Sequence, residues 1–261
     1  MNGRTCLITG ATDGIGKETA IGMAKNGYNL ILIGRNEEKG KKVSDEIRKI
    51  ADSIDIDFFK ADLMLMKEVS RVADEVRQKY DRIDVLINNV GAYFAFRDVT
   101  EEGFERTFAL NHLGYFLMTK KLLDLVEASD YARIVSVSSS AHYGTSFEFD
   151  NLNGEKKYRG FKAYQKSKLA NVMFTYELAK RVKDRGITAN CLHPGFVASR
   201  FGSNNNLLWR GVIGFAKALM AINVKKGART SVHLACSDDV KDITGKFFAN
   251  CEVKKGSAKA K

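Results

Sequence analysis

Tyr164 and Lys168 are the two residues whose types and spacing most directly suggest acid–base chemistry. Four residues apart, they share one face if residues 161–184 form a helix. A free phenol has a pKa of about 10 and is a poor proton donor or acceptor at neutral pH, whereas a nearby ammonium stabilises the phenolate. We therefore expect Lys168 to lower the pKa of Tyr164, so that Tyr164 can give or take a proton.

A glycine-rich turn near the N-terminus is the second candidate for chemistry. Residues 9–16 follow an apolar stretch at 4–9 and precede Ala20, Met23 and Ala24, which recur at helical spacing. Glycines at such a turn let backbone N–H groups approach a pyrophosphate at the start of a helix. This context predicts a dinucleotide site whose contacts are Gly10, Thr12, Asp13, Gly14, Ile15 and Gly16.

Apolar stretches alternate with amphipathic ones along the rest of the chain. Strands are expected at 4–9, 29–33, 54–60, 83–88, 132–138, 187–192 and 246–249, and helices at 36–51, 67–80, 101–127 and 161–184. The alternation predicts an α/β fold with a doubly wound parallel sheet (Rossmann-like) of about seven strands and helices on both faces.

No linker or break in composition divides the chain, so residues 1–251 are expected to form a single domain. Ligands of such sheets bind at the carboxyl ends of the strands. The apolar, glycine-containing segment at about 196–224 is expected to cover the substrate there. The lysine-rich residues 252–261 are expected to be a disordered tail.

Composition limits the class of protein. The net charge of +11 favours anionic partners, but the basic residues are scattered and form no nucleic-acid-binding module. No apolar stretch approaches the roughly 18 residues of a membrane span, and no signal peptide precedes the first strand, so we expect an intracellular, cytoplasmic protein. The four cysteines lack metal-ligand spacing, so reduced thiols and no metal site are expected.

Together, these motifs resemble the short-chain dehydrogenase/reductase family in its compact form. The glycine spacing Gly-x-x-x-Gly-x-Gly, Ser138-Ser139 at a strand end, and Tyr164-x-x-x-Lys168 carry the resemblance. Segments 137–142, 164–171 and 193–195 are similar to the retinol dehydrogenase and WW-domain-oxidoreductase branch. The resemblance implies hydride transfer between a nicotinamide and a carbonyl or a primary or secondary alcohol, with a lipophilic, retinoid-like substrate.

The resemblance also implies roles for individual residues. Ser139 would hydrogen-bond the substrate oxygen, with Ser138 as the alternative, and Asn111 would support a proton relay behind Lys168. His112 and His142 mark the branch and are expected to form structural hydrogen bonds. The further cofactor contacts that it implies are Asp62, Leu63, Asn89, Gly91, Tyr164, Lys168, Pro194, Gly195, Val197 and Ser199.

The end of the second strand indicates which cofactor is bound. An acidic residue there would bind the ribose hydroxyls and repel a 2′-phosphate, but this chain has Arg35 followed by Asn36. Arg35 can pair with a phosphate, and Lys39 lies one turn later. NADP(H) is therefore favoured over NAD(H), although Glu37 and Glu38 nearby argue the other way.

Three alternatives remain open. A sensor or scaffold that binds NADP(H) with negligible turnover would share the glycine loop, but it would not need Ser139, Tyr164, Lys168 and Asn111. Peripheral membrane contact through Leu207, Leu208, Trp209 and Phe215 is less favoured than a substrate-covering loop. A homodimer is a further expectation, because helices 101–127 and 161–184 carry more apolar residues than one sheet face requires.

Overall fold

The structure is a computed structural model that describes residues 3–195 and 223–260. The first two strands of its sheet are β1 (Thr5–Thr9) and β2 (Asn29–Gly34), whose residues are all buried. The two strands pair in parallel, with Thr5 opposite Asn29. Unbroken burial along both strands is what a parallel sheet covered on both faces requires, as the sequence predicted.

Within the described residues, the sheet has eight strands in the order β3-β2-β1-β4-β5-β6-β7-β8. Every neighbouring pair is parallel except β7 and β8, which form an antiparallel edge. The order reverses between β1 and β4, and a ligand crevice is expected beside that point. The remaining strands are β3 (Ile56–Lys60), β4 (Val85–Asn88), β5 (Arg133–Val137), β6 (Thr188–Leu192), β7 (Phe247–Ala249) and β8 (Glu252–Lys254).

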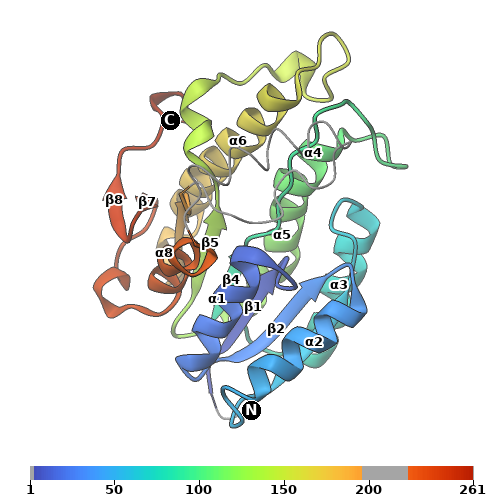
Figure 1. The fold of residues 1–261 in the computed structure, drawn as a ribbon. Coiled ribbons are helices and arrows are strands. Elements are labelled where there is room, and N and C mark those ends of the chain that lie inside the picture. Colours follow the sequence, from blue (N-terminus) through green and yellow to red (C-terminus); the bar gives the residue numbers. More distant parts are fainter. Residues whose placement is uncertain (1–2, 196–222, 261) are drawn as a thin grey trace.

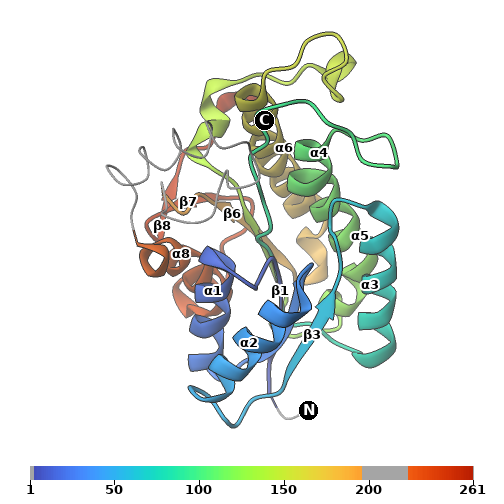
Figure 2. The same ribbon diagram turned by 45° about the vertical axis from the view of Figure 1, so that its right-hand side comes forward.

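Helices cover both faces of the sheet (Figures 1 and 2). On one face, α1 (Gly14–Lys25), α2 (Glu37–Arg48) and α8 (Val224–Cys236) enclose one apolar core. On the other face, α3 (Met66–Lys79), α5 (Gly114–Glu127) and α6 (Gly160–Arg181) enclose a second core. The doubly wound α/β architecture expected from the sequence is confirmed.

The region expected to be one helix at 101–127 is divided in the structure. A short helix α4 (Arg106–Phe108) leads into a π-helical turn at Ala109–Leu113, and α5 follows. The carboxylate of Glu105 fixes the start of α4, because it accepts hydrogen bonds from the N–H groups of Thr107 and Phe108 at 2.8 and 2.9 Å. The π-helical turn contains Asn111, and such turns often occur at functional sites.

The C-terminal segment also differs from the disordered tail that we expected. Glu252–Lys254 form β8, and Ala258–Ala260 form a 3₁₀ turn. Ala260 is buried with Leu169, Val172 and Phe247. The small side chains of this segment permit close packing against α6.

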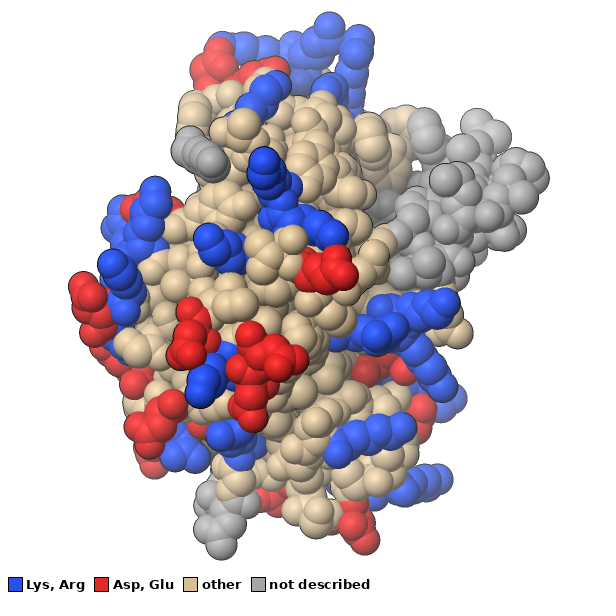
Figure 3. Space-filling view, turned by 90° about the vertical axis from the view of Figure 1, so that its left-hand side faces the viewer, with Lys and Arg blue, Asp and Glu red and all other residues tan. Residues whose placement is uncertain are grey.

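On the side that carries β7 and β8, the residues that the structure describes form a strongly charged surface but no one continuous basic patch (Figure 3). Figure 3 shows Lys and Arg side chains there singly and in small groups, with Asp and Glu side chains between several of them. Among the helices that the structure describes, none is long and apolar enough to cross a membrane.

Candidate functional site

The glycine turn between β1 and α1 is built so that only glycine fits. Gly10 and Gly14 have positive φ values of 69° and 55°, which L-residues with side chains rarely adopt. A Cβ at position 16 would lie 2.2 Å from the carbonyl oxygen of Gly10. The side chain of Asp13 accepts a hydrogen bond from the N–H of Gly14 at 2.8 Å and caps α1. The turn therefore presents backbone at the start of a helix, which favours an anion.

The end of β4 is fixed against this turn. Asn89 donates its side-chain amide to the carbonyl oxygen of Thr9 at 2.8 Å, and its backbone N–H bonds the Thr9 hydroxyl at 2.9 Å. A Cβ at Gly10 would lie 2.9 Å from Cα of Val90. Asn89 thus joins the two strands at which the strand order reverses.

A cavity of about 140 Å³ lies at this edge of the sheet. It collects predicted cofactor contacts from four separate loops, and its lining includes Gly10, Thr12, Arg35, Asp62, Leu63 and Gly91. A side chain at Gly10 or Gly16 would collide with the surrounding backbone. This cavity, called the cofactor cradle below, has room for part of a dinucleotide, at the carboxyl ends of the strands where such ligands bind.

The residues after β2 are divided between the cavity and the helix. Arg35 is exposed and lines the cavity. Asn36 instead caps α2, because its side chain accepts the N–H of Lys39 at 2.8 Å. Glu37 lies 3.7 Å from Lys60 in an ion pair, so its charge is partly balanced.

The turn after β6 lies at the same edge of the sheet. His193 bonds the carbonyl oxygen of Phe248 on β7 through its backbone N–H, and the N–H of Gly195 bonds Nδ1 of His193 at 3.1 Å. Gly195, with a φ of 83°, follows Pro194 directly. The predicted contacts Val197 and Ser199 and the apolar residues around Trp209 lie outside the described residues, as does the covering segment expected at about 196–224 except for its last two residues.

Tyr164 and Lys168 both lie on α6 and are both buried. Nζ of Lys168 donates to the carbonyl oxygen of Val137, at the end of β5, at 3.0 Å. The same nitrogen lies 5.9 Å from the centre of the Tyr164 ring. The helical spacing therefore brings the lysine nitrogen beside the tyrosine ring, at the end of β5.

The two serines after β5 have different surroundings. The hydroxyl of Ser138 is buried and donates to the carbonyl oxygen of Lys168 at 2.7 Å. Ser139 Oγ accepts the N–H of Ala141 at 3.2 Å and hydrogen-bonds Tyr164. The geometry thus favours Ser139 over Ser138 as the hydroxyl beside the phenol.

Asn111 is fully buried behind Lys168. Its side-chain oxygen accepts the N–H of Ala92 at 2.9 Å, and its amide donates to the carbonyl oxygen of Ala92 and to the hydroxyl of Ser167 at 3.0 and 3.1 Å. A second asparagine, Asn171, donates to the backbone oxygen of Asn111 at 2.8 Å. The π-helical turn is thereby fixed against α6.

The pKa values of the pair differ from our expectation for Tyr164. Burial raises the pKa of Tyr164 to about 12, although the hydrogen bond with Ser139 opposes this effect. Burial also lowers the pKa of Lys168 to about 7. The i, i+4 spacing indicates an ammonium beside the phenol, but it does not reveal that both groups lose their surrounding water, which disfavours both charged forms.

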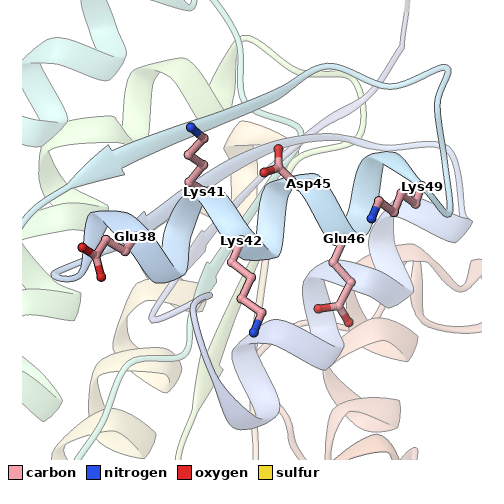
Figure 4. A pocket seen from close by; sticks show the side chains of 6 residues that line it. All are labelled: Glu38, Lys41, Lys42, Asp45, Glu46 and Lys49. Carbon is pink, nitrogen blue, oxygen red and sulfur yellow. The ribbon is translucent and has the colours of Figure 1, made fainter.

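A larger hollow of about 550 Å³ lies along α2 and differs in character from this site. It is lined by Glu38, Lys41, Lys42, Asp45, Glu46 and Lys49 (Figure 4). Glu46 forms an ion pair with Lys17 of α1 at 2.7 Å. Alternating charges along one solvated helix face are expected of a surface helix.

Across residues 3–195 and 223–260, no cluster of three or more His, Cys, Asp or Glu side chains could hold a metal ion.

Comparison with known proteins identifies the family. The model described as short chain dehydrogenase matches residues 4–207. The chain belongs to the short-chain dehydrogenase family. It is 38% identical to retinol dehydrogenase 12 of Mus musculus over 253 residues, which cover 96% of this chain and 78% of that protein. It is also 38% identical to human retinol dehydrogenase 11, covering all of this chain and 81% of that protein.

A solved structure gives the same result. A putative NAD(P)-dependent gluconate 5-dehydrogenase from Beutenbergia cavernae with bound NADP superimposes with a TM-score of 0.76 at 26% identity, covering 95% of each chain. The resemblance to the family and to its retinol dehydrogenase branch is therefore confirmed.

Two tyrosines near the site of this short-chain dehydrogenase were missed by the sequence analysis. The hydroxyl of Tyr115 donates to the carbonyl oxygen of Val90 at 2.6 Å, and Lys168 Nζ lies 5.6 Å from its ring centre. The ring of Tyr93 packs edge-on against Tyr164, with 6.4 Å between ring centres. The spacing from Asn111 to Tyr115 would have indicated a shared helix face.

Proposed function

We propose that this short-chain dehydrogenase uses NADP(H) to interconvert carbonyl compounds with primary or secondary alcohols, and that its substrates are lipophilic aldehydes or ketones of retinoid-like character. The observation that supports this proposal most directly is that the cofactor cradle lies next to Lys168 of the acid–base pair. Gly91 lines the cavity, and a Cβ there would lie 3.2 Å from Lys168 Nζ. A ligand that fills the cradle therefore reaches the tyrosine–lysine pair.

The preference for NADP(H) rests on the cavity wall at the end of β2. Arg35 lies there, where an acidic residue would repel a 2′-phosphate. The gluconate 5-dehydrogenase structure holds bound NADP at low occupancy, which supports the same choice. In this proposal, Thr12 and the start of α1 hold the pyrophosphate, and Asp62 and Leu63 hold the adenine side.

When bound, the nicotinamide supplies or accepts the hydride. At neutral pH Tyr164 is protonated, because its pKa is raised to about 12. Its phenol therefore donates a proton to the carbonyl oxygen as charge develops there. Ser139 donates a second hydrogen bond to that oxygen and holds it within reach of the phenol.

Lys168 and Asn111 support the proton transfer indirectly, through charge and positioning. Protonation of Lys168 places a positive charge beside Tyr164, which stabilises the phenolate left after proton transfer. Anionic cofactor phosphates would favour that protonated form. Asn111 hydrogen-bonds the backbone N–H of Ala92 and the hydroxyl of Ser167, the residue before Lys168, and so helps to hold the lysine in position.

The proposed substrate class is supported by the names of the relatives and by the packing of two aromatic rings at the site. The two curated relatives are named as retinol dehydrogenases. Tyr93 provides an aromatic wall beside Tyr164, which suits an apolar or conjugated substrate.

The experiment is NADPH oxidation against short, aromatic, long-chain and retinoid aldehydes and ketones, with NADH in parallel. We expect turnover that is faster with NADPH and fastest with the lipophilic aldehydes. Binding of NADPH without turnover of any carbonyl would contradict the proposal and favour the sensor or scaffold alternative.

We also propose a homodimer formed through α5 and α6. A groove of about 920 Å³ runs between these helices, and its walls include the exposed side chains Phe116 and Phe149, which are 47% and 72% exposed. Apolar side chains in a contiguous groove are typical of an interface. Light scattering should give a dimer mass that Phe116→Glu reduces to the monomer mass. A monomer in the wild type would contradict this proposal.

A further inference from the structure

His142 connects the loop that carries Ser139 to the C-terminal segment, residues 255–260. Its side chain is completely buried. One ring nitrogen, Nδ1, lies 2.6 Å from the carbonyl oxygen of Ser139. The other, Nε2, lies 3.1 Å from the backbone nitrogen of Ser257, 115 positions later in the chain.

These two contacts determine the protonation of the ring. The backbone N–H of Ser257 can only donate, so Nε2 of His142 must accept. The carbonyl oxygen of Ser139 can only accept, so Nδ1 must carry the hydrogen. His142 is therefore a neutral imidazole with its hydrogen on Nδ1, and both of its nitrogens are satisfied.

The C-terminal segment is packed tightly enough to act as an anchor. Ser257 and Ala260 are 7% and 5% exposed. The hydroxyl of Tyr143, next to His142, donates to the carbonyl oxygen of Lys255 at 2.5 Å. A Cβ at Gly256 would lie 2.3 Å from the hydroxyl of Tyr176 on α6, so the segment runs directly against that helix.

The loop after β5 is thus held on two sides. On the α6 side, the side-chain amide of Gln165 donates to the carbonyl oxygen of Ala141 at 3.3 Å. On the other side, the ring of His142 packs 4.6 Å from the ring of Phe247 on β7 and holds the C-terminal segment. The Ser139 carbonyl also accepts the backbone N–H of His142 at 3.1 Å, so the histidine sets the orientation of that peptide directly.

We propose that His142 is a positioning residue, and that the C-terminal segment holds Ser139 in place through it. This inference rests on the proposed function for the role of Ser139 in turnover. Loss of the anchor would let the Ser139 hydroxyl move relative to Tyr164 while leaving the cofactor cradle intact. A misplacement of about 1 Å at a reacting group can lower the rate by about 100-fold.

Variants of the full chain separate positioning from folding. His142→Phe keeps a ring against Phe247 but removes both hydrogen bonds. His142→Asn can restore the bond to Ser139, because its side-chain amide reaches the region occupied by Nδ1, but it cannot reach Ser257. Ala260→Asp places a charge at a buried position of the segment, and Ala258→Asp is the matched control, because Ala258 is exposed.

For turnover, we expect kcat to fall about 10- to 100-fold in His142→Phe and Ala260→Asp, with partial recovery in His142→Asn and no change in Ala258→Asp. The Kd for NADPH should stay within about twofold throughout, measured by fluorescence. Wild-type kcat in both His142→Phe and Ala260→Asp would overturn the proposal.

Two measurements do not depend on turnover, so they remain decisive if the proposed function fails. The ¹⁵N NMR spectrum should show His142 with its hydrogen on Nδ1. Amide hydrogen exchange at residues 139–144 should speed up at least tenfold in Ala260→Asp but not in Ala258→Asp. A hydrogen on Nε2, or unchanged exchange in Ala260→Asp, would overturn the proposal.

Discussion

Gly91 leaves room for Lys168: a Cβ at position 91 would lie 3.2 Å from Lys168 Nζ and 3.4 Å from Oδ1 of Asn111. The glycine belongs to the loop after β4 and lines the cavity at the switch in strand order. The lysine reaches the same point from α6. Two segments far apart in the sequence therefore join the cofactor cradle to the acid–base pair.

Gly91→Ala tests this arrangement. The added methyl group should displace the lysine side chain, because the approach is closer than most Cβ contacts. We expect kcat to fall about tenfold or more, with a smaller change in the Kd for NADPH. The measurements are steady-state kinetics and NADPH titration, with circular dichroism to confirm the fold. An unchanged kcat in a folded variant would show that Lys168 does not need its present position.

Ser139→Ala and Ser138→Ala form a matched pair. Loss of a donor to the developing oxyanion typically lowers kcat by about 10²–10³-fold, so Ser139→Ala should be strongly impaired. Ser138 donates to the backbone of Lys168, so its replacement should mainly cost stability, about 1–3 kcal/mol. Kinetics and chemical denaturation of both variants check this division. A greater kinetic loss in Ser138→Ala would reverse the assignment.

Arg35→Ala tests the cofactor preference. Removal of the guanidinium should weaken NADPH binding about 10- to 100-fold, because a charge-assisted pair with the 2′-phosphate is lost, and should change NADH binding little. Isothermal titration with both cofactors measures this. Lys41→Ala is the control, since Lys41 lies on the exposed face of α2. Equal losses for NADPH and NADH would contradict a role for Arg35 in phosphate recognition.

Lys168→Met should increase stability while it removes activity. Burial lowers the pKa of Lys168 from 10.5 to about 7, so between these values the unfolded chain binds a proton that the folded chain lacks. The free energy of unfolding of the wild type therefore decreases as the pH falls from 10.5 towards 7. The variant should be more stable by about 1–4 kcal/mol at pH 7.

Denaturant unfolding at pH 7 and pH 10 measures this effect. The stability difference between Lys168→Met and the wild type should be larger at pH 7 than at pH 10. A variant that is less stable than the wild type at pH 7 would contradict the desolvation argument.

The sequence predicted the parts of the site that depend on local spacing. The glycine turn and the i, i+4 relation between Tyr164 and Lys168 follow from the geometry of one turn and one helix. The parallel sheet with helices on both faces could be anticipated because buried apolar strands alternate with helices along the chain. Each of these inferences uses residues close together in the chain or a general rule of topology.

Features that depend on distant packing were not predicted. The π-helical turn at Asn111 arises from hydrogen bonds to residue 92 and Ser167, which no local pattern reveals. The pKa of Tyr164 depends on burial by several elements. The contact between Ser257 and His142 joins positions 115 residues apart, and the lysines of that segment indicated a solvated tail.

The most direct test of the central claim is NADPH oxidation by Tyr164→Phe with the best carbonyl substrate of the wild type, alongside NADPH titration. The account predicts that turnover falls by at least about 100-fold, because the phenolic proton is lost, while the Kd for NADPH stays within about twofold. Turnover near the wild-type level in a variant that still binds NADPH would contradict the assignment of Tyr164 as the proton donor.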